Sequence, residues 1–205
     1  MSAMLVPVTK DDVEPAPTHH QHAVQFYESE ESLYKTVSTF LGQGLIDGQP
    51  AILIATPSHQ SAILAHLTDR AIDVEKAQGK GDLVVLDAQE TLDLFMTGDV
   101  PDAATFNVAV GGIVDRALSG RAKRTMVRAY GEMVDVLWRA GRSDAAIRLE
   151  MLWNKLAMDY GFALLCGYAM GNFYKETARF EEVCRQHAYI VPPDFDSLPI
   201  PSPTR

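Results

Sequence analysis

Several features that would suggest a secreted, membrane-bound or nucleic-acid-binding protein are scarce in this sequence. Its only two cysteines, Cys166 and Cys184, are too few for a disulfide framework and lack the spacing of a zinc motif. No apolar run approaches the roughly 20 residues of a membrane helix, and residues 1–15 do not resemble a signal peptide. The formal net charge of −9 disfavours a nucleic-acid groove, which needs a basic surface. We therefore predict a cytoplasmic protein without direct contact to membrane or nucleic acid.

Motifs for catalysis and for cofactor binding are also missing. The sequence contains no G-x-S-x-G, no H-E-x-x-H and no Cys-x-x-Cys. The glycines of residues 42–48 follow a predicted helix, whereas a dinucleotide-binding loop follows a strand. Residues 28–32 (ESEES) follow the first predicted strand and hold three acids but no glycine or lysine, so they would repel a phosphate. We predict no phosphate loop, no cofactor, no metal site and no catalytic residue, although these absences do not exclude catalysis.

What the sequence does contain is an alternation of apolar strands with amphipathic helices. Residues 50–57 (PAILIATP) are almost continuously apolar, as in a parallel strand that is buried on both faces. The alternation predicts an α/β fold, a three-layer, doubly wound and mostly parallel five-stranded sheet. The predicted strands are 22–27, 50–57, 83–87, 125–131 and 162–168, and the predicted helices are 31–42, a helix beginning at Ser58, 90–96, 102–118, 144–160 and 172–186.

Residues 19–191 are predicted to form one domain between two less regular segments. Residues 1–18 read as a flexible leader because they are polar and contain three prolines, and residues 192–205 read as a Pro-rich tail. Residues 72–74 could form a short edge element. His19, His20 and His22 could bind a metal, but histidine-rich runs are also common in mobile leaders.

Residues 125–153 carry the strongest functional signal. A strand that ends at Gly131 is followed by Glu132 in an apolar neighbourhood, and the next helix places Glu150 beside Trp153. Ligands in open α/β folds bind beyond the carboxyl ends of parallel strands, and right-handed crossovers gather those ends on one rim. We expect this rim to collect Tyr27, Glu28, Thr56, His59, Asp87, Tyr130, Glu132, Cys166 and Tyr168.

The two glutamates also have purely structural explanations. Glu132 could cap the following helical turn or pair with Arg128 or Arg148, and Glu150 could pair with the same arginines. Trp153, like Trp138, could belong to the core, with the indole N–H groups donating to the two carboxylates.

His22 and Cys166 likewise allow more than one interpretation. A histidine at the start of a strand is often hydrogen-bonded and structural, but it could also bind a ligand or sense pH. Cys166 could be a small buried hydrophobe, a soft metal ligand, or a redox thiol beside His22 across the sheet.

Four segments, taken in this order, resemble the MEDS family of sensory domains: HAVQFYE, GEMVDVLWRAG, RLEMLWNKLA and ALLCGY. The resemblance covers roughly residues 22–191 and implies a RecA/KaiC-like core without a phosphate loop. It also implies recognition of small hydrocarbon derivatives and association with histidine kinases or other signalling modules. The positions that match characteristic residues of the family are His22, Tyr27, Glu28, Gly131, Glu132, Glu150, Trp153, Cys166 and Tyr168.

Together these observations predict a non-catalytic cytoplasmic sensory module. A small, partly apolar ligand would bind in one rim pocket walled by Tyr27, Tyr130, Trp153 and Tyr168, with Glu132 and His22 as polar anchors. The module would relay the signal to a histidine kinase or response regulator, and it could form a homo-oligomer. Two alternatives stay open: a degenerate ATPase-like scaffold for protein docking, and an enzyme with residual nucleotide binding.

Overall fold

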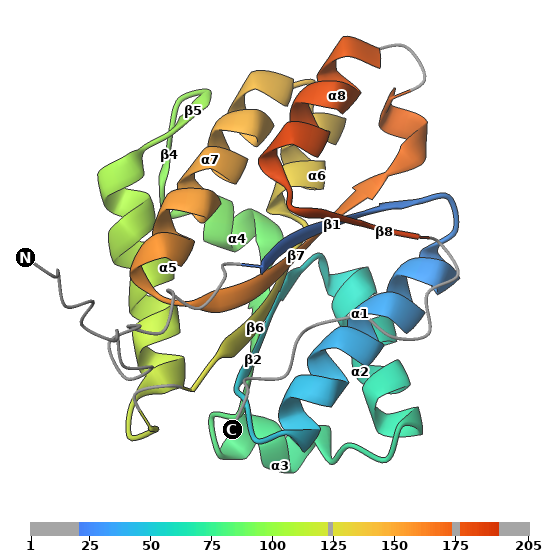
Figure 1. The fold of residues 1–205 in the computed structure, drawn as a ribbon, viewed down its shortest axis with the longest axis vertical. Coiled ribbons are helices and arrows are strands. Elements are labelled where there is room, and N and C mark those ends of the chain that lie inside the picture. The colour runs from blue at the N-terminus through green and yellow to red at the C-terminus, as the bar shows by residue number, and fades with distance from the viewer. Residues whose placement is uncertain (1–20, 123–124, 174–176, 193–205) are drawn as a thin grey trace, which may run out of the picture.

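The computed structural model describes residues 21–122, 125–173 and 177–192. The predicted leader (residues 1–18), His19, His20 and the predicted tail from residue 193 onward lie outside the described residues. The described part is built of three layers, with a central sheet between two layers of helices (Figure 1). Within it, no helix combines the length and the apolar character that crossing a bilayer requires.

The central layer is a six-stranded parallel sheet with the order β3-β2-β6-β7-β1-β8. The predicted α/β class and mostly parallel sheet are confirmed, but the predicted number of five strands is wrong. The additional strand, β8, has only three residues, which is too short for a periodic pattern to show. The strands are β1 (Gln21–Tyr27), β2 (Ala51–Ala55), β3 (Leu83–Asp87), β6 (Val127–Gly131), β7 (Phe162–Ala169) and β8 (Tyr189–Val191).

Helices cover both faces of this sheet (Figure 1). Each face carries its own apolar core, as expected for a parallel sheet that is buried on both sides. One face, here called the α1 face, is covered by α1 (Glu30–Ile46), α2 (Pro57–Asp69) and α3 (Val74–Gly79). The other, here called the α7 face, is covered by α4 (Ala88–Asp93), α5 (Ala103–Leu118), α6 (Met133–Arg139), α7 (Ser143–Asp159) and α8 (Thr177–Gln186).

Several local predictions need correction. Residues 72–74 form no edge strand, because Asp73 caps α3 by accepting a hydrogen bond from the backbone N–H of Lys76 at 3.0 Å. The helix predicted over 90–96 ends at Asp93 and leads into an antiparallel hairpin, β4 (Met96–Thr97) and β5 (Val100–Pro101), which turns through Gly98 at a φ of 60°. The start of the helix predicted over 172–186 is replaced by a 3₁₀ turn, η1 (Met170–Phe173). The sequence pattern did not indicate α6.

The strand order places a topological switch point between β2 and β6 at the carboxyl edge of the sheet. These strands are neighbours, but β2 leads into α2 on the α1 face and β6 leads into α6 on the α7 face. Ligands of open α/β folds bind at such switch points, because the loops diverge there and leave the strand ends accessible. Thr56 and Glu132 are the first residues beyond these two strands.

Candidate functional site

The candidate site residues form two separate groups, one at the carboxyl edge of the sheet and one buried against the α7 face. The rim cluster lies at the carboxyl ends of the strands and comprises Tyr27, His59, Tyr130, Glu132, Asp135 and Arg139. The buried cluster lies against the α7 face and comprises His22, Glu150, Cys166, Tyr168 and His187.

The predicted single pocket is therefore wrong. Successive side chains of a strand point to opposite faces of the sheet. Tyr27 and Tyr130 belong to the core of the α1 face, whereas Tyr168 and Trp153 belong to the core of the α7 face. The sheet stands between these pairs, so they cannot wall one cavity.

Glu132 is the centre of the rim cluster. Its backbone N–H donates to the carbonyl of Ile54 at 3.1 Å, which extends the pairing of β6 with β2 by one residue. Its carboxylate accepts hydrogen bonds from the backbone N–H of Thr56 and from His59 Nδ1, both at 2.5 Å, and from the Tyr130 hydroxyl at 3.3 Å. The arginine pairing predicted for Glu132 is therefore replaced by a histidine, a hydroxyl and a backbone amide.

Asp135 joins the ends of three elements at the same rim. Its Oδ1 accepts from the backbone N–H of Ala169 at 3.0 Å and from the amide of Asn172 at 2.7 Å. Its Oδ2 lies 2.6 Å from the Arg139 guanidinium and accepts from the Tyr27 hydroxyl at 3.4 Å. Arg139 also donates to the Tyr27 hydroxyl at 2.6 Å, so α6 is tied to the ends of both β1 and β7.

Burial and charge set the protonation of the rim. The hydrogen bond that His59 donates to Glu132 raises the pKa of His59 despite the opposing effect of burial. Burial raises the pKa of Asp135, and the Arg139 charge counters this only in part. Burial, together with the charge of Glu132, raises the pKa of Tyr130 well above its usual value. At neutral pH, the two rim tyrosines are therefore neutral hydrogen-bond donors.

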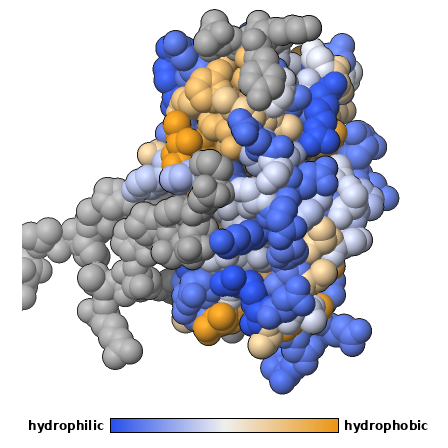
Figure 2. Space-filling view, turned by 90° about the vertical axis from the view of Figure 1, so that its right-hand side faces the viewer, coloured by the Kyte–Doolittle hydropathy of each residue, from blue (hydrophilic) through white to orange (hydrophobic). Residues whose placement is uncertain are grey.

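The surface above the rim is mixed in character. Figure 2 views the molecule from the side toward which β1 and β7 run in Figure 1, and it shows mostly hydrophilic residues with an apolar patch in the upper half. Arg139 is half exposed and Glu30 is largely exposed, whereas His59 and Glu132 are buried beneath them. Glu28, another predicted site residue, is exposed on the loop after β1.

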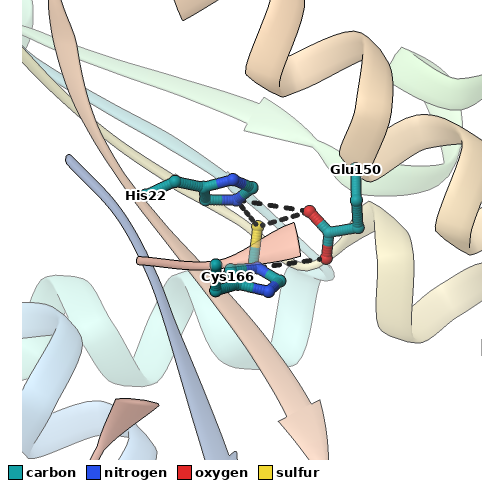
Figure 3. Close-up of side chains that lie close together, drawn as sticks. His22, Glu150 and Cys166 are labelled. Atoms are coloured by element: carbon teal, nitrogen blue, oxygen red, sulfur yellow. Dashed lines mark hydrogen bonds and ion pairs between the residues drawn. The ribbon is translucent and has the colours of Figure 1, made fainter. Parts of the chain in front are cut away.

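The buried cluster gathers side chains from β1, α7, β7 and the residue that follows α8 (Figure 3). His22 Nε2 lies 3.3 Å from the sulfur of Cys166 and 3.3 Å from Glu150 Oε2. The Cys166 thiol donates to Glu150 Oε2 at 3.4 Å, and the Tyr168 hydroxyl donates to Glu150 Oε1 at 2.8 Å. His187 Nε2 lies 3.4 Å from Glu150 Oε1. The predicted proximity of Cys166 and His22 is confirmed, but Glu150 is paired with histidines and not with an arginine.

Charges inside the buried cluster compensate one another. Burial alone would raise the pKa of Glu150, but the positive charge of the neighbouring His187 lowers it far below its usual value. Burial tends to lower the pKa of His187, but the Glu150 carboxylate outweighs it and the net shift is upward. Burial lowers the pKa of His22 and raises that of the Cys166 thiol. These shifts favour an ionised Glu150–His187 pair beside a neutral imidazole and a neutral thiol.

Trp153 is a core residue in this structure. It is buried and packs edge-to-face against Phe106 and Phe162, with ring centroids 5.4 and 5.8 Å away. The carboxylates of Glu132 and Glu150 accept hydrogen bonds from other groups than the tryptophans. Trp153 therefore braces α7 and so holds Glu150 against the sheet.

Three residues of the two clusters carried little or no signal in the sequence. Asp135 and Arg139 lie in α6, which had not been predicted, although their spacing of four residues suits a helical ion pair. His187 lies just before β8, in a stretch that the sequence pattern indicates to be irregular. Its position in the cluster depends on contacts with residues far away in the chain.

The comparisons with known proteins bear on the family of this chain. Residues 21–188 match the sequence model described as "MEDS: MEthanogen/methylotroph, DcmR Sensory domain". The comparison with curated proteins finds no match. The matched residues include both clusters and every strand of the central sheet except β8.

Proposed function

The chain belongs to the MEDS family of sensory domains, and we propose that it is a non-catalytic cytoplasmic sensor that binds a small, partly apolar molecule at the rim cluster. The family assignment supports the sensory role. The position of the rim cluster, at the switch point between β2 and β6, supports the choice of site.

The chemistry of the rim suits a small ligand with one polar end. Glu132 and Asp135 are buried carboxylates, and Arg139 offers a half-exposed guanidinium at the edge of the same cluster. The rings of Tyr27 and Tyr34 pack edge-to-face against the His59 ring and supply apolar surface. Ligand sites commonly combine apolar walls with a few converging polar groups. A ligand hydroxyl or amine would bind the carboxylates, and its hydrocarbon part would lie against the aromatic rings.

Signal transfer would start at α6. Asp135 and Arg139 connect this helix to the ends of β1 and β7, and α6 packs against α7. A ligand that binds one arrangement of these contacts more tightly than another shifts the population toward that arrangement. The partner protein would then read the changed position of α6 and α7.

A groove on the outer side of α7 is a suitable place for that partner. It has a volume of about 570 Å³ and lies between α7, α8 and the β4–β5 hairpin. Its lining includes apolar residues such as Val100 and Met151 and charges of both signs, including Asp144, Lys155 and Arg179. Met151 is more than half exposed. A histidine kinase or response regulator could bind here with an apolar segment flanked by charges.

The test of ligand binding is a thermal-shift screen with small alcohols, halocarbons and metabolites. A ligand present at 100 times its Kd stabilises the folded state by about 2.7 kcal/mol. For a domain of this size, that corresponds to a rise in Tm of about 5–10 °C. The shift should disappear in Arg139→Gln and persist in Arg116→Gln, a control at an exposed arginine of α5.

Two outcomes would contradict the proposal. One is a broad panel in which no compound stabilises the wild-type chain. The other is a kinase that binds the chain equally well with and without ligands and with rim substitutions. That result would favour a docking scaffold. The RecA/KaiC-like organisation of the core stays a prediction. The acidic loop 28–32 would repel a nucleotide's phosphates, and this supports a function without nucleotide turnover.

A further inference from the structure

The buried cluster contains four potential metal ligands that converge on one point. They are His22, Glu150, Cys166 and His187, and one donor atom of each lies within 4.8 Å of the donor atoms of the other three. The four side chains are buried and come from four different elements, β1, α7, β7 and the residue after α8. In Figure 3 the labelled imidazole, thiol and carboxylate point toward one another.

The outer contacts of His22 favour the tautomer that carries its hydrogen on Nδ1. Asn154 Nδ2 donates to the backbone carbonyl of Gln186 at 3.0 Å, and this orients its amide oxygen toward His22. His22 Nδ1 therefore donates to Asn154 Oδ1, at 2.9 Å. The neutral ring then presents the lone pair of Nε2 to the centre of the cluster. An amide or carbonyl that orients the outer nitrogen in this way is typical of metal-binding histidines.

His187 is oriented by the same principle. Its Nδ1 donates to the backbone carbonyl of Val183 at 2.8 Å, so Nε2 also points inward. This Nε2 is buried and makes no hydrogen bond to any group of the described protein, although Glu150 Oε1 lies 3.4 Å away. A buried nitrogen without a hydrogen bond is costly, unless it meets an ion or a water molecule.

The spacing of three of the donor atoms matches tetrahedral zinc. With Zn–N and Zn–O distances of about 2.0–2.1 Å and Zn–S of about 2.3 Å, neighbouring donors lie about 3.3–3.6 Å apart. Three contacts among His22 Nε2, Cys166 Sγ and Glu150 Oε2 lie in this range, at 3.3, 3.4 and 3.3 Å. His187 Nε2 lies 3.4 Å from the other carboxylate oxygen, Glu150 Oε1, and the four donor atoms lie within 4.8 Å of one another. Hydrogen bonds and the Glu150–His187 ion pair explain individual contacts, and the zinc site rests on the convergence of two imidazole nitrogens, a thiol and a carboxylate on one point.

We propose that the chain binds one zinc ion through His22, Glu150, Cys166 and His187. The ligand set combines two imidazoles, a thiolate and a carboxylate, which suits zinc in a closed, four-coordinate structural site. Cys166 and His187 give up their protons to solvent when the ion binds, because zinc takes the thiolate and the neutral imidazole. Tyr168 keeps its hydrogen bond to Glu150 and so orients the carboxylate without binding the ion itself.

The ion would attach the C-terminal part of the domain to the sheet. His187 lies between α8 and β8, and the backbone N–H of Ala188 donates to the carbonyl of His22 at 2.8 Å. β8 is a three-residue edge strand, and two of its side chains are exposed. Zinc would hold this short strand and α8 against β1, so metal occupancy would set how firmly the C-terminal segment is attached.

The first experiment needs no substitution. The full chain is purified without a histidine tag, its zinc content is measured, and the zinc K-edge absorption spectrum is recorded. We expect one zinc per chain, with one sulfur neighbour at about 2.3 Å and three nitrogen or oxygen neighbours at about 2.0–2.1 Å. Cobalt(II) added to the metal-free chain should give a sulfur-to-metal charge-transfer band and the intense visible bands of tetrahedral coordination.

Matched variants then locate the site. Cys166→Ser should lose the charge-transfer band and stoichiometric zinc, whereas Cys184→Ser, a partly buried cysteine outside the cluster, should keep both. His187→Gln should lose stoichiometric zinc as well, and Asn154→Ala should weaken zinc affinity about 10–100-fold, since it removes an outer partner of a ligand. Circular dichroism of each variant checks that the fold is retained.

Two results would overturn the zinc site. A folded wild-type chain that takes up no zinc and shows no sulfur-to-cobalt band would exclude it, and this result does not depend on whether any variant folds. Stoichiometric zinc without a sulfur neighbour would also exclude it, especially if the zinc is lost from a His19→Ala/His20→Ala chain, because binding would then lie outside the cluster.

Discussion

Replacing Gly167 by alanine tests the packing that holds the rim cluster in place. Gly167 lies in β7 with its open side toward the ring of Tyr130. A Cβ added there would lie 2.6 Å from the Tyr130 hydroxyl oxygen and 3.2 Å from both Leu33 Cδ1 and Tyr130 Cε2. Side chains essentially never come as close as 2.6 Å, and these neighbours are fully buried. The Tyr130 ring must therefore move, and its hydrogen bond to Glu132 is strained or lost.

The expected loss follows from two contributions. Overpacking a buried site costs about 1–3 kcal/mol, and losing the hydrogen bond to Glu132 adds about 1 kcal/mol. We expect Gly167→Ala to lower the free energy of unfolding by about 2–4 kcal/mol, measured by urea denaturation. Gly112→Ala is the control, because its Cβ would meet nothing closer than Arg116 Nη1 at 3.6 Å and it lies within α5. Alanine in a helix interior should stabilise by up to about 1 kcal/mol.

A double-mutant cycle identifies the clashing atom. Tyr130→Phe removes the hydroxyl oxygen and should cost about 1 kcal/mol alone, because Glu132 loses one donor. Combined with Gly167→Ala, it should be less destabilising than the sum of the single changes, by about 1 kcal/mol. Additive losses, or a Gly167→Ala variant as stable as Gly112→Ala, would refute this account of the contact between β6 and β7.

Other parts of the rim allow three further predictions. Glu132 raises the pKa of His59, so the wild type should be more stable than His59→Gln at low pH. This difference in the free energy of unfolding should be fully present below pH 6.5 and should fade as the pH rises through the folded-state pKa of His59. Urea denaturation of both proteins at about pH 6 and pH 9 measures the difference. Asp135→Ala should lower the free energy of unfolding by about 1–3 kcal/mol in the same assay, since the backbone N–H of Ala169 loses its acceptor, whereas the exposed Asp69→Ala should change it by less than about 0.5 kcal/mol. Isothermal titration with Mg–ATP should show no micromolar binding, because the acidic loop 28–32 repels phosphate; a clear binding isotherm would contradict that loop's assigned role.

The sequence predicts those elements that residue pattern alone determines. The strands β2, β6 and β7 were located to within about two residues, because parallel strands buried on both faces are continuous apolar runs. The short strand β8 and the short helix α6 were not found, because their stability comes from β1 and α7 and not from their own pattern. Glu132 stood out because it is a charge among buried apolar residues. Its partner His59 is 73 positions away, and no local signal connects the two.

The predicted pocket failed because of the strand register. Within β7, Cys166 and Tyr168 are two residues apart and must share a face. Tyr130 pairs with Leu165, which points to the opposite face from Cys166, so Tyr130 and Tyr168 lie on different sides of the sheet. A shift of one residue between β6 and β7 would have placed them together. No sequence pattern in these buried strands sets that register, because both faces are apolar.

The end of β7 connects the two clusters that the sheet separates. The Tyr168 hydroxyl donates to Glu150 in the buried cluster, and the next backbone N–H, that of Ala169, donates to Asp135 at the rim. A movement of this strand end that tightens one contact would change the other.

Coupling between two sites is reciprocal, so a rim ligand and the buried ion would have to alter each other's affinity by the same factor. The same rim-ligand titration, run on zinc-loaded and zinc-free protein, measures that factor, and a tenfold difference in Kd would correspond to about 1.4 kcal/mol of coupling. Equal affinities in the two forms would mean that zinc only stabilises the fold and that sensing depends on the rim alone.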